Sequence, residues 1–152
     1  MIVTVLYRAS NSPDVSGMSN PFIDVPAQAY YYAPVVWAAS NDIVRGDGLN
    51  CFLPDDYVSR QQLAVILCRF AAFNGNPFPR DALEDNPEAL LAALTLRFAD
   101  AGDIEDYARA PVYALVSKGV MLGGIDGKFN PNEYGTRAQT SAILRRYMTL
   151  AA

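Results

Sequence analysis

Histidine is absent from the 152 residues, and its absence removes several classes of site. A Ser–His or Cys–His catalytic pair cannot form without it. The two cysteines, Cys51 and Cys68, do not form a Cys-x-x-Cys pair, and no histidine is present to complete a zinc ligand set. A disulfide between them stays open, because thiols in a repeat protein need not face each other. A hydrolase based on paired carboxylates is not excluded, while no metal or cofactor is expected.

Charge is also scarce, since 18% of the residues are charged and 51% are hydrophobic. Such a chain has enough apolar residues for a core and too little charge for a disordered chain. The formal net charge of −4, with no basic stripe to offset it, argues against a nucleic-acid partner. No run of about 18 apolar residues is present, so no membrane span is predicted. Residues 1–8 lack a basic region and a small-residue cleavage site, so no signal peptide is expected in this sequence.

A duplicated segment is the most informative feature that is present. Residues 46–69 and 123–146 each begin with glycine and continue to Phe-x-Pro, then to a hydroxyl–arginine pair, and end in Leu-x-Arg. The second copy follows the first at a constant offset of 77 residues. A duplication of this length indicates stacked structural repeats, because one helix pair cannot bury its apolar face alone.

The pattern of each copy predicts two helices joined by a loop that glycine bounds. Residues 1–9 read as the end of a helix from a preceding repeat, and the simplest interpretation is a fragment that begins inside that repeat. The first helix of the next unit is expected from about residue 30 to 41, stopping near Gly46. Pro34 and Pro111 recur at the same helical position, and both are expected in a first turn, where the missing N–H is harmless.

The second helix of each copy has clear start signals. Ser59 and Thr136 are suitable N-caps, and Gln62 and Gln139 stand three residues later, as in a capping box. Residues 74–88 are expected to form a loop, with a short extra helix over 88–96. The predicted boundaries are a truncated repeat with linker at 1–21, a repeat at 22–73, a linker at 74–97 and a repeat at 98–152.

These residues resemble the S-layer homology domain. The opening Phe-x-Asp-Val of that family is matched at residues 22–25 and, in part, at 98–101. Its glycine turn is matched at 119–123, its Phe-x-Pro at 129–131, and its Thr-Arg-Ala segment at 136–139. Each piece alone is weak evidence, whereas the ordered set appears twice and covers nearly the whole chain.

The resemblance implies an all-α fold of helix-loop-helix repeats packed as a pseudo-threefold bundle. It also implies a non-catalytic, extracellular module that anchors a larger exported protein to the cell surface of a Gram-positive-type envelope. The ligand would be a secondary cell-wall polymer, often with a pyruvylated amino sugar, bound in the grooves between repeats. The arginine of the Thr-Arg motif is the main contact in that family, and here this role falls to Arg60 and Arg137. The other ligand-binding candidates are Ser59, Thr136, Asp24, Asp100, Gly46, Gly123, Tyr30, Tyr107, Trp37, Gln62 and Gln139.

Structural roles compete with these assignments. The two arginines can instead pair with an aspartate or a helix end of the next repeat. Asp24 and Asp100 can cap helices, and Trp37 and the tyrosines can belong to the core. A second function class also stays open, in which degenerate repeats mediate protein–protein assembly, with a homo-oligomer favoured by the incomplete first repeat. Residues 126–128 resemble part of a calcium loop, but oxygen ligands are missing at positions 122 and 124.

Overall fold

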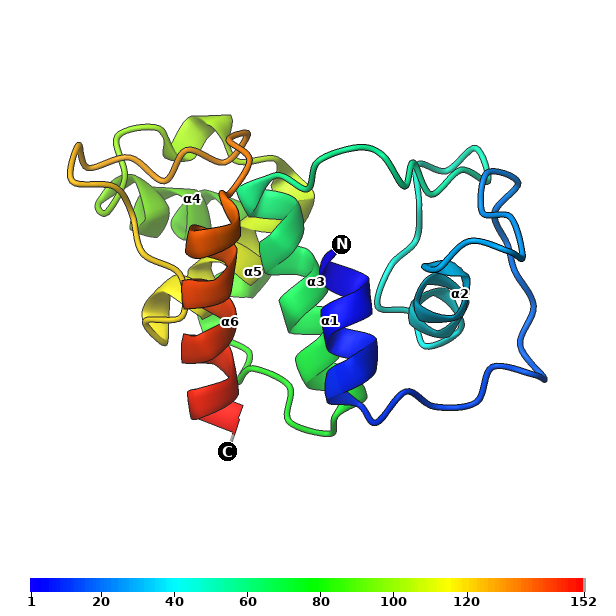
Figure 1. The fold of residues 1–152 in the computed structure, drawn as a ribbon. Helices are drawn as coiled ribbons and strands as arrows, with labels where there is room; N and C mark the ends of the chain where they lie inside the picture. The colour runs from blue at the N-terminus through cyan, green and yellow to red at the C-terminus, as the bar shows by residue number, and fades with distance from the viewer. Residues whose placement is uncertain (152) are drawn as a thin grey trace. The chain divides into compact units, whose positions relative to one another are not determined.

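The computed structural model describes residues 1–151, and the chain separates into two compact units that divide between Asp56 and Tyr57. The described residues form α-helices joined by loops and short 3₁₀ turns (Figure 1). Among them is one isolated β-bridge, between Ser59 and Tyr134. The predicted all-α class is therefore confirmed, while the threefold arrangement stays a prediction. Within residues 1–151, no helix has the length and apolar character needed to cross a membrane.

The first unit is built on the contact between α1 (Ile2–Ala9) and α2 (Tyr32–Ser40). In Figure 1 α1 stands upright and α2 is seen end-on, so the two helices cross. The ring of Trp37 lies buried at the centre, with its centroid 5.6 Å from that of Tyr7 in an edge-to-face contact. Burial of these aromatic and branched side chains provides the main stabilisation of the unit. The other buried residues of the two helices are Val3, Leu6, Pro34, Val35, Val36 and Ala38.

The end of α2 differs from the prediction, which placed it near Gly46. The helix ends at Ser40, because Asp42 adopts a left-handed conformation with φ of 58°. The N–H of Ile43 then donates to the carbonyl of Ala38 and closes a Schellman turn. Gly119 has the same role after α5, with φ of 69°. An aspartate can replace glycine here at a modest energetic cost, which sequence patterns do not reveal.

The second unit contains α3 (Arg60–Phe73), α4 (Pro87–Thr95), α5 (Asp106–Ser117) and α6 (Arg137–Ala151), together with two 3₁₀ turns, Ala82–Asp85 and Ala101–Asp103. Helix α3 packs against α5, and α4 packs against α5 and both 3₁₀ turns (Figure 1). Helix α4 confirms the predicted extra helix. The segment predicted as a loop over residues 74–88 contains the first of the 3₁₀ turns.

The first-turn prediction is right for Pro34 and wrong for Pro111. Pro34 is the third residue of α2, whereas Pro111 lies inside α5. The difference arises because α5 begins at Asp106, earlier in its repeat than Tyr32 does in α2. An interior proline removes one helical hydrogen bond, so this part of α5 depends more on its packing.

The interface of α3 and α5 holds one of the two cysteines. Cys68 lies there with its Sγ 3.8 Å from the carbonyl oxygen of Pro111, and burial raises the pKa of its thiol to about 12. Both Cys51 and Cys68 are free thiols. On α6, Ile143 and Tyr147 are buried, whereas Leu144 is only half-buried.

Candidate functional site at a repeat seam

Two aspartates hold the Phe-x-Pro loops in both units. Each carboxylate accepts hydrogen bonds from two consecutive backbone N–H groups, one at each oxygen. The bonds measure 2.7–2.8 Å and run from Phe52 and Leu53 to Asp24, and from Phe129 and Asn130 to Asp100. The alternative in which these aspartates cap the helix that follows them does not apply to these bonds, because their partners lie 28–30 residues further along the chain. Both carboxylates therefore have a structural task, and their role in ligand binding stays a prediction.

The glycines at the start of each loop accommodate an aromatic ring. A Cβ added to Gly46 would lie 2.6 Å from Cε1 of Phe22, and one added to Gly123 would lie 2.5 Å from Cε1 of Phe98. Such distances are far below van der Waals contact, so any side chain here would displace the ring. Both glycines are ligand-binding candidates, and the geometry shows that each has a packing task, because a ring occupies the space of its missing side chain.

The hydroxyl–arginine pairs start α3 and α6, as predicted. The Ser59 hydroxyl accepts a hydrogen bond from the N–H of Gln62, and the side chain of Gln62 accepts one from the N–H of Ser59. Thr136 and Gln139 make the same reciprocal pair at 2.8 and 3.2 Å. These capping boxes fix the backbone from which Arg60 and Arg137 extend.

Arg60 extends onto the loop of the following repeat. Its Nε donates to the carbonyl oxygen of Phe129 at 2.8 Å, and its Nη2 donates to that of Leu122 at 2.7 Å. The guanidinium carbon lies 4.9 Å from the centroid of the Phe129 ring, within the range of a cation–π contact. Burial lowers the pKa of Arg60, opposed by the nearby charges of Glu133 and Asp100. We call the contact of residues 59–62 with residues 120–134 the repeat seam.

Backbone hydrogen bonds close the repeat seam. The N–H groups of Arg60 and Gln61 donate to the carbonyl oxygens of Glu133 and Pro131, at 2.9 and 3.0 Å. These are two of the N–H groups that a helix N-terminus leaves without intrahelical partners. The loop of one repeat thus caps the second helix of the repeat before it.

Gln61 is a seam residue that the sequence analysis missed. Its side chain is 4% exposed, donates to Oδ1 of Asn132 at 2.7 Å and accepts from the N–H of Glu105 at 2.9 Å. A buried amide with both ends satisfied ties three segments together. The equivalent residue of the other copy is Ala138, and this difference between repeats is the signal that identifies Gln61.

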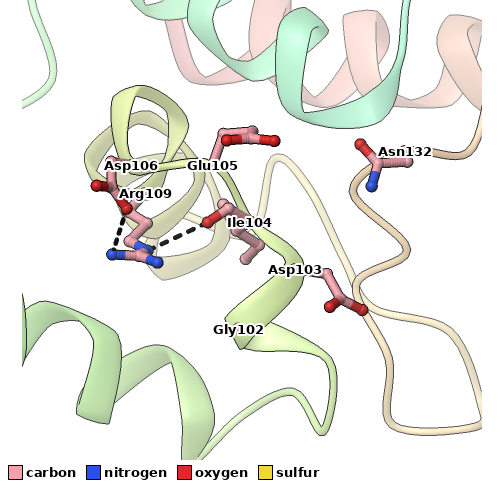
Figure 2. A pocket seen from close by; sticks show the side chains of 7 residues that line it. All are labelled: Gly102, Asp103, Ile104, Glu105, Asp106, Arg109 and Asn132. Carbon is pink, nitrogen blue, oxygen red and sulfur yellow. Dashed lines mark hydrogen bonds and ion pairs between the residues drawn. The ribbon is translucent and has the colours of Figure 1, made fainter.

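A pocket of about 320 Å³ lies beside the seam, next to both partners of Gln61. Figure 2 shows Arg109 and Asp106 on one side of it and Asp103 and Asn132 on the other. Arg109 forms an ion pair with Asp106 at 2.6 Å and donates from Nε to the carbonyl oxygen of Ile104 at 3.2 Å. The pocket is lined by Gly102, Asp103, Ile104, Glu105, Asp106, Arg109 and Asn132. Three carboxylates against one guanidinium make this pocket negative overall.

The remaining predicted site residues are not gathered at the seam. Arg137 is exposed, and within residues 1–151 its side chain forms no hydrogen bond or ion pair. Tyr30 is 77% exposed and Tyr107 is 57% exposed. Trp37 is buried against α1, so its ring offers no face to a ligand and fits the core interpretation.

Comparison with known proteins agrees with this geometry. The family model of the S-layer homology domain matches residues 21–64 and 97–141. The "Surface-layer 125 kDa protein" of Lysinibacillus sphaericus is 30% identical over 128 residues, covering 82% of this chain and 10% of the relative. An "Endoglucanase" of Bacillus sp. (strain KSM-635) is 24% identical over 146 residues, covering 96% of this chain and 14% of the relative. The chain thus spans only a small part of these relatives, and it belongs to the S-layer homology domain family.

Proposed function

We propose that this chain is a non-catalytic module that anchors a larger protein at the cell surface. The ligand is an anionic cell-wall polysaccharide, a secondary cell-wall polymer whose sugars carry carboxylates, as pyruvylated amino sugars do. Arg60 and Arg137 are the contacts to the acidic groups. Membership of the S-layer homology family and similarity to a surface-layer protein support this role. The endoglucanase similarity is compatible with the same view, because it covers only 14% of that relative.

The charge state of the motif arginines is the observation that carries the proposal. Three other arginines, Arg45, Arg80 and Arg109, each form an ion pair with an aspartate. In the described part of the chain, Arg60 has only neutral carbonyl oxygens and a phenyl ring as close partners, and Arg137 has none. Within the described residues neither arginine forms an ion pair, so both guanidinium groups remain available to an anionic ligand, and the nearby carboxylates of Asp100 and Glu133 offset part of the Arg60 charge.

The geometry of Arg60 also leaves donors for a ligand. A guanidinium carries five N–H donors, and the Nε and Nη2 edge is used by the two carbonyl oxygens. The edge formed by Nη1 and the second hydrogen of Nη2 has no partner among the described residues. A carboxylate can bind this outer edge with two parallel hydrogen bonds, while the loop holds the inner edge in place.

The pocket in Figure 2 is a poor place for the acidic group. Its single guanidinium, that of Arg109, is already paired with Asp106, and Asp103 and Glu105 add two further carboxylates. An anion placed there would meet net repulsion. The proposed contact is therefore the outer edge of Arg60, and the pocket accommodates at most a neutral part of the polymer.

Binding of purified secondary cell-wall polymer, measured by calorimetry, tests the proposal. We expect Arg60→Ala and Arg137→Ala each to weaken binding about tenfold or more, since each removes a charge-assisted contact. Arg45→Ala is the matched control, because Arg45 is exposed but neutralised by Asp42, and it should bind like wild type. Circular dichroism of each variant confirms that it is folded. Equal binding by wild type and the Arg60/Arg137 double variant would show that the arginine assignment is wrong.

An assembly module is the second candidate, and one observation favours it. The N–H groups of Arg137 and Ala138 have no acceptor within residues 1–151, whereas those of Arg60 and Gln61 are capped by a repeat loop. The first residues of α6 thus resemble the first residues of α3, except that no loop accepts hydrogen bonds from their backbone N–H groups. They could bind the corresponding loop of another S-layer homology repeat. Light scattering over a range of concentrations tests this, because an oligomer that Arg137→Ala dissociates supports assembly and a monomer at every concentration opposes it.

A further inference from the structure

Two exposed tyrosines form a contacting pair beside the repeat seam. Tyr57 is 77% exposed and Tyr134 is 61% exposed, yet their ring centroids lie only 5.5 Å apart with an interplanar angle of 37°. The two residues occupy the same position in successive repeats, 77 residues apart. Large aromatic side chains usually bury most of their area, so a touching pair that keeps this exposure is a candidate binding surface.

The backbone places this pair next to Arg60. Ser59 and Tyr134 form the antiparallel bridge, and the N–H of Arg60 donates to the carbonyl of Glu133 at 2.9 Å. Tyr57 precedes Ser59 by two residues, and its ring reaches across to Tyr134. The seam's hydrogen bonds thus place the backbone that carries the Tyr134 ring beside the backbone of Arg60, and the Tyr57 ring contacts that of Tyr134.

The phenol hydroxyls of the two tyrosines are also available for hydrogen bonds. Within residues 1–151, neither phenol hydroxyl of Tyr57 and Tyr134 makes a hydrogen bond. Each ring therefore offers an apolar face together with a donor and acceptor at its tip. A sugar ring has the complementary character, with C–H groups on its faces and hydroxyls around its edge.

We propose that Tyr57 and Tyr134 form a stacking platform for the pyranose ring of a carboxylated sugar whose acidic group binds the outer edge of Arg60. This inference rests on the proposed glycan-binding function and adds the second half of its site. The positive charge of Arg60, which forms no ion pair within the described residues, favours an acidic sugar over an apolar protein surface. Glu133 is exposed beside Tyr134 and repels the same anion, so it limits the affinity.

The test compares binding of native polymer with binding of polymer whose carboxylates have been reduced to alcohols. We expect the Tyr57→Ala/Tyr134→Ala variant to bind native polymer about tenfold more weakly than wild type, as loss of aromatic contacts of this kind implies. The Tyr57→Phe/Tyr134→Phe variant keeps the ring faces and should stay within about threefold of wild type. On reduced polymer, the alanine variant should still lose affinity, while Arg60→Ala should match wild type.

Each part of the assignment can fail separately. If the arginine variants lose binding and the tyrosine-to-alanine variant does not, the platform is wrong and the anchoring function stands. If the phenylalanine variant loses as much as the alanine variant, the hydroxyls act alone and stacking is wrong. If neither the arginine nor the tyrosine variants change binding of native polymer, both the proposed function and the proposed stacking platform are wrong.

Discussion

The loops over residues 43–56 and 120–133 have the same internal frame, although they belong to different units. Each is held by an aspartate through two backbone N–H groups, and each seats a phenylalanine ring on the ring of its Phe-x-Pro, at 5.4 and 5.5 Å. Leu53 and Asn130 share a left-handed φ of 58° and 57°. The frame is therefore encoded within each repeat and needs no neighbour.

The two loops differ in what covers them. Arg60 and the start of α3 lie on the second loop, and Phe129 is completely buried there. Within the first unit no arginine from another segment is bonded to the first loop, and Phe52 is only half-buried. The comparison indicates that the aspartate fixes the conformation of the loop. The arginine of the preceding repeat covers the loop and binds its carbonyl oxygens, and we call this contact the seal. The predictions below separate these two tasks.

Removal of the loop clamp should have the largest effect. In Asp100→Ala, two part-buried N–H groups lose a charged acceptor, and we expect a loss of about 3 kcal/mol of unfolding free energy. Chemical denaturation followed by circular dichroism measures it. Asp103→Ala is the control, because Asp103 is exposed and makes no side-chain hydrogen bond in the described chain. A loss in Asp100→Ala no larger than in this control would show that the clamp does not stabilise the loop.

Removal of the seal should have a smaller effect, and only at one of the two motif arginines. Arg60→Ala loses two charge-assisted hydrogen bonds and a cation–π contact, and we expect about 2 kcal/mol of destabilisation. Arg137→Ala should change stability by less than about 0.5 kcal/mol, because it is exposed. The same denaturation experiment on dilute protein compares them. Equal losses of unfolding free energy in Arg60→Ala and Arg137→Ala would show that the contacts of Arg60 with the loop do not stabilise the protein.

The Gln61 contacts should contribute less again. Gln61→Ala makes the start of α3 equivalent to that of α6, and we expect a loss of about 1 kcal/mol, since each neutral hydrogen bond contributes modestly. Hydrogen exchange at the Glu105 amide reports the local loosening. The reverse change, Ala138→Gln, should give no gain, because no loop of the second unit, as far as it is described, lies at that position to receive the amide. A gain there would contradict the view that the start of α6 is uncovered.

Acid should loosen the first loop gradually. The N–H of Phe52 donates to Asp24 and lowers the pKa of that carboxyl below its ordinary 3.8. A depressed folded-state pKa means that the stabilisation is complete above pH 3.8 and disappears as the pH falls through the lower, folded value. Amide chemical shifts of Phe52 and Leu53 should follow this titration, and Asp24→Asn should abolish it. Shifts that are flat down to the point of global unfolding would argue against the clamp in this loop.

Much of the fold follows from local signals in the sequence. The capping boxes at Ser59 and Thr136 were predictable, because a cap is made by residues three positions apart. The short helix near Glu88 and the buried stripe of α6 follow from apolar spacing in the same way. The family and the repeat were evident because ordered motifs recur at one offset.

The parts that escaped prediction depend on partners distant in sequence. Asp24 and Asp100 look like helix caps because their true partners, 28–30 residues away, become visible only in three dimensions. The role of Gln61 was hard to predict for the same reason, because both groups that it binds lie beyond residue 100. The assignment of Arg60 and Arg137 to a ligand stays a prediction, although the structure distinguishes a sealed arginine from an open one.

The helix partners have a consequence for how such a chain can evolve. Helix α3, which ends one repeat, packs on α5, which begins the next. Recombination that cuts between sequence motifs would therefore separate the two helices of this core, whereas a breakpoint inside the Phe-x-Pro loop would keep these helices together and instead separate an aspartate from the loop that it holds. Ancestral duplications of these genes should consequently be out of phase with the motifs by which the family is recognised.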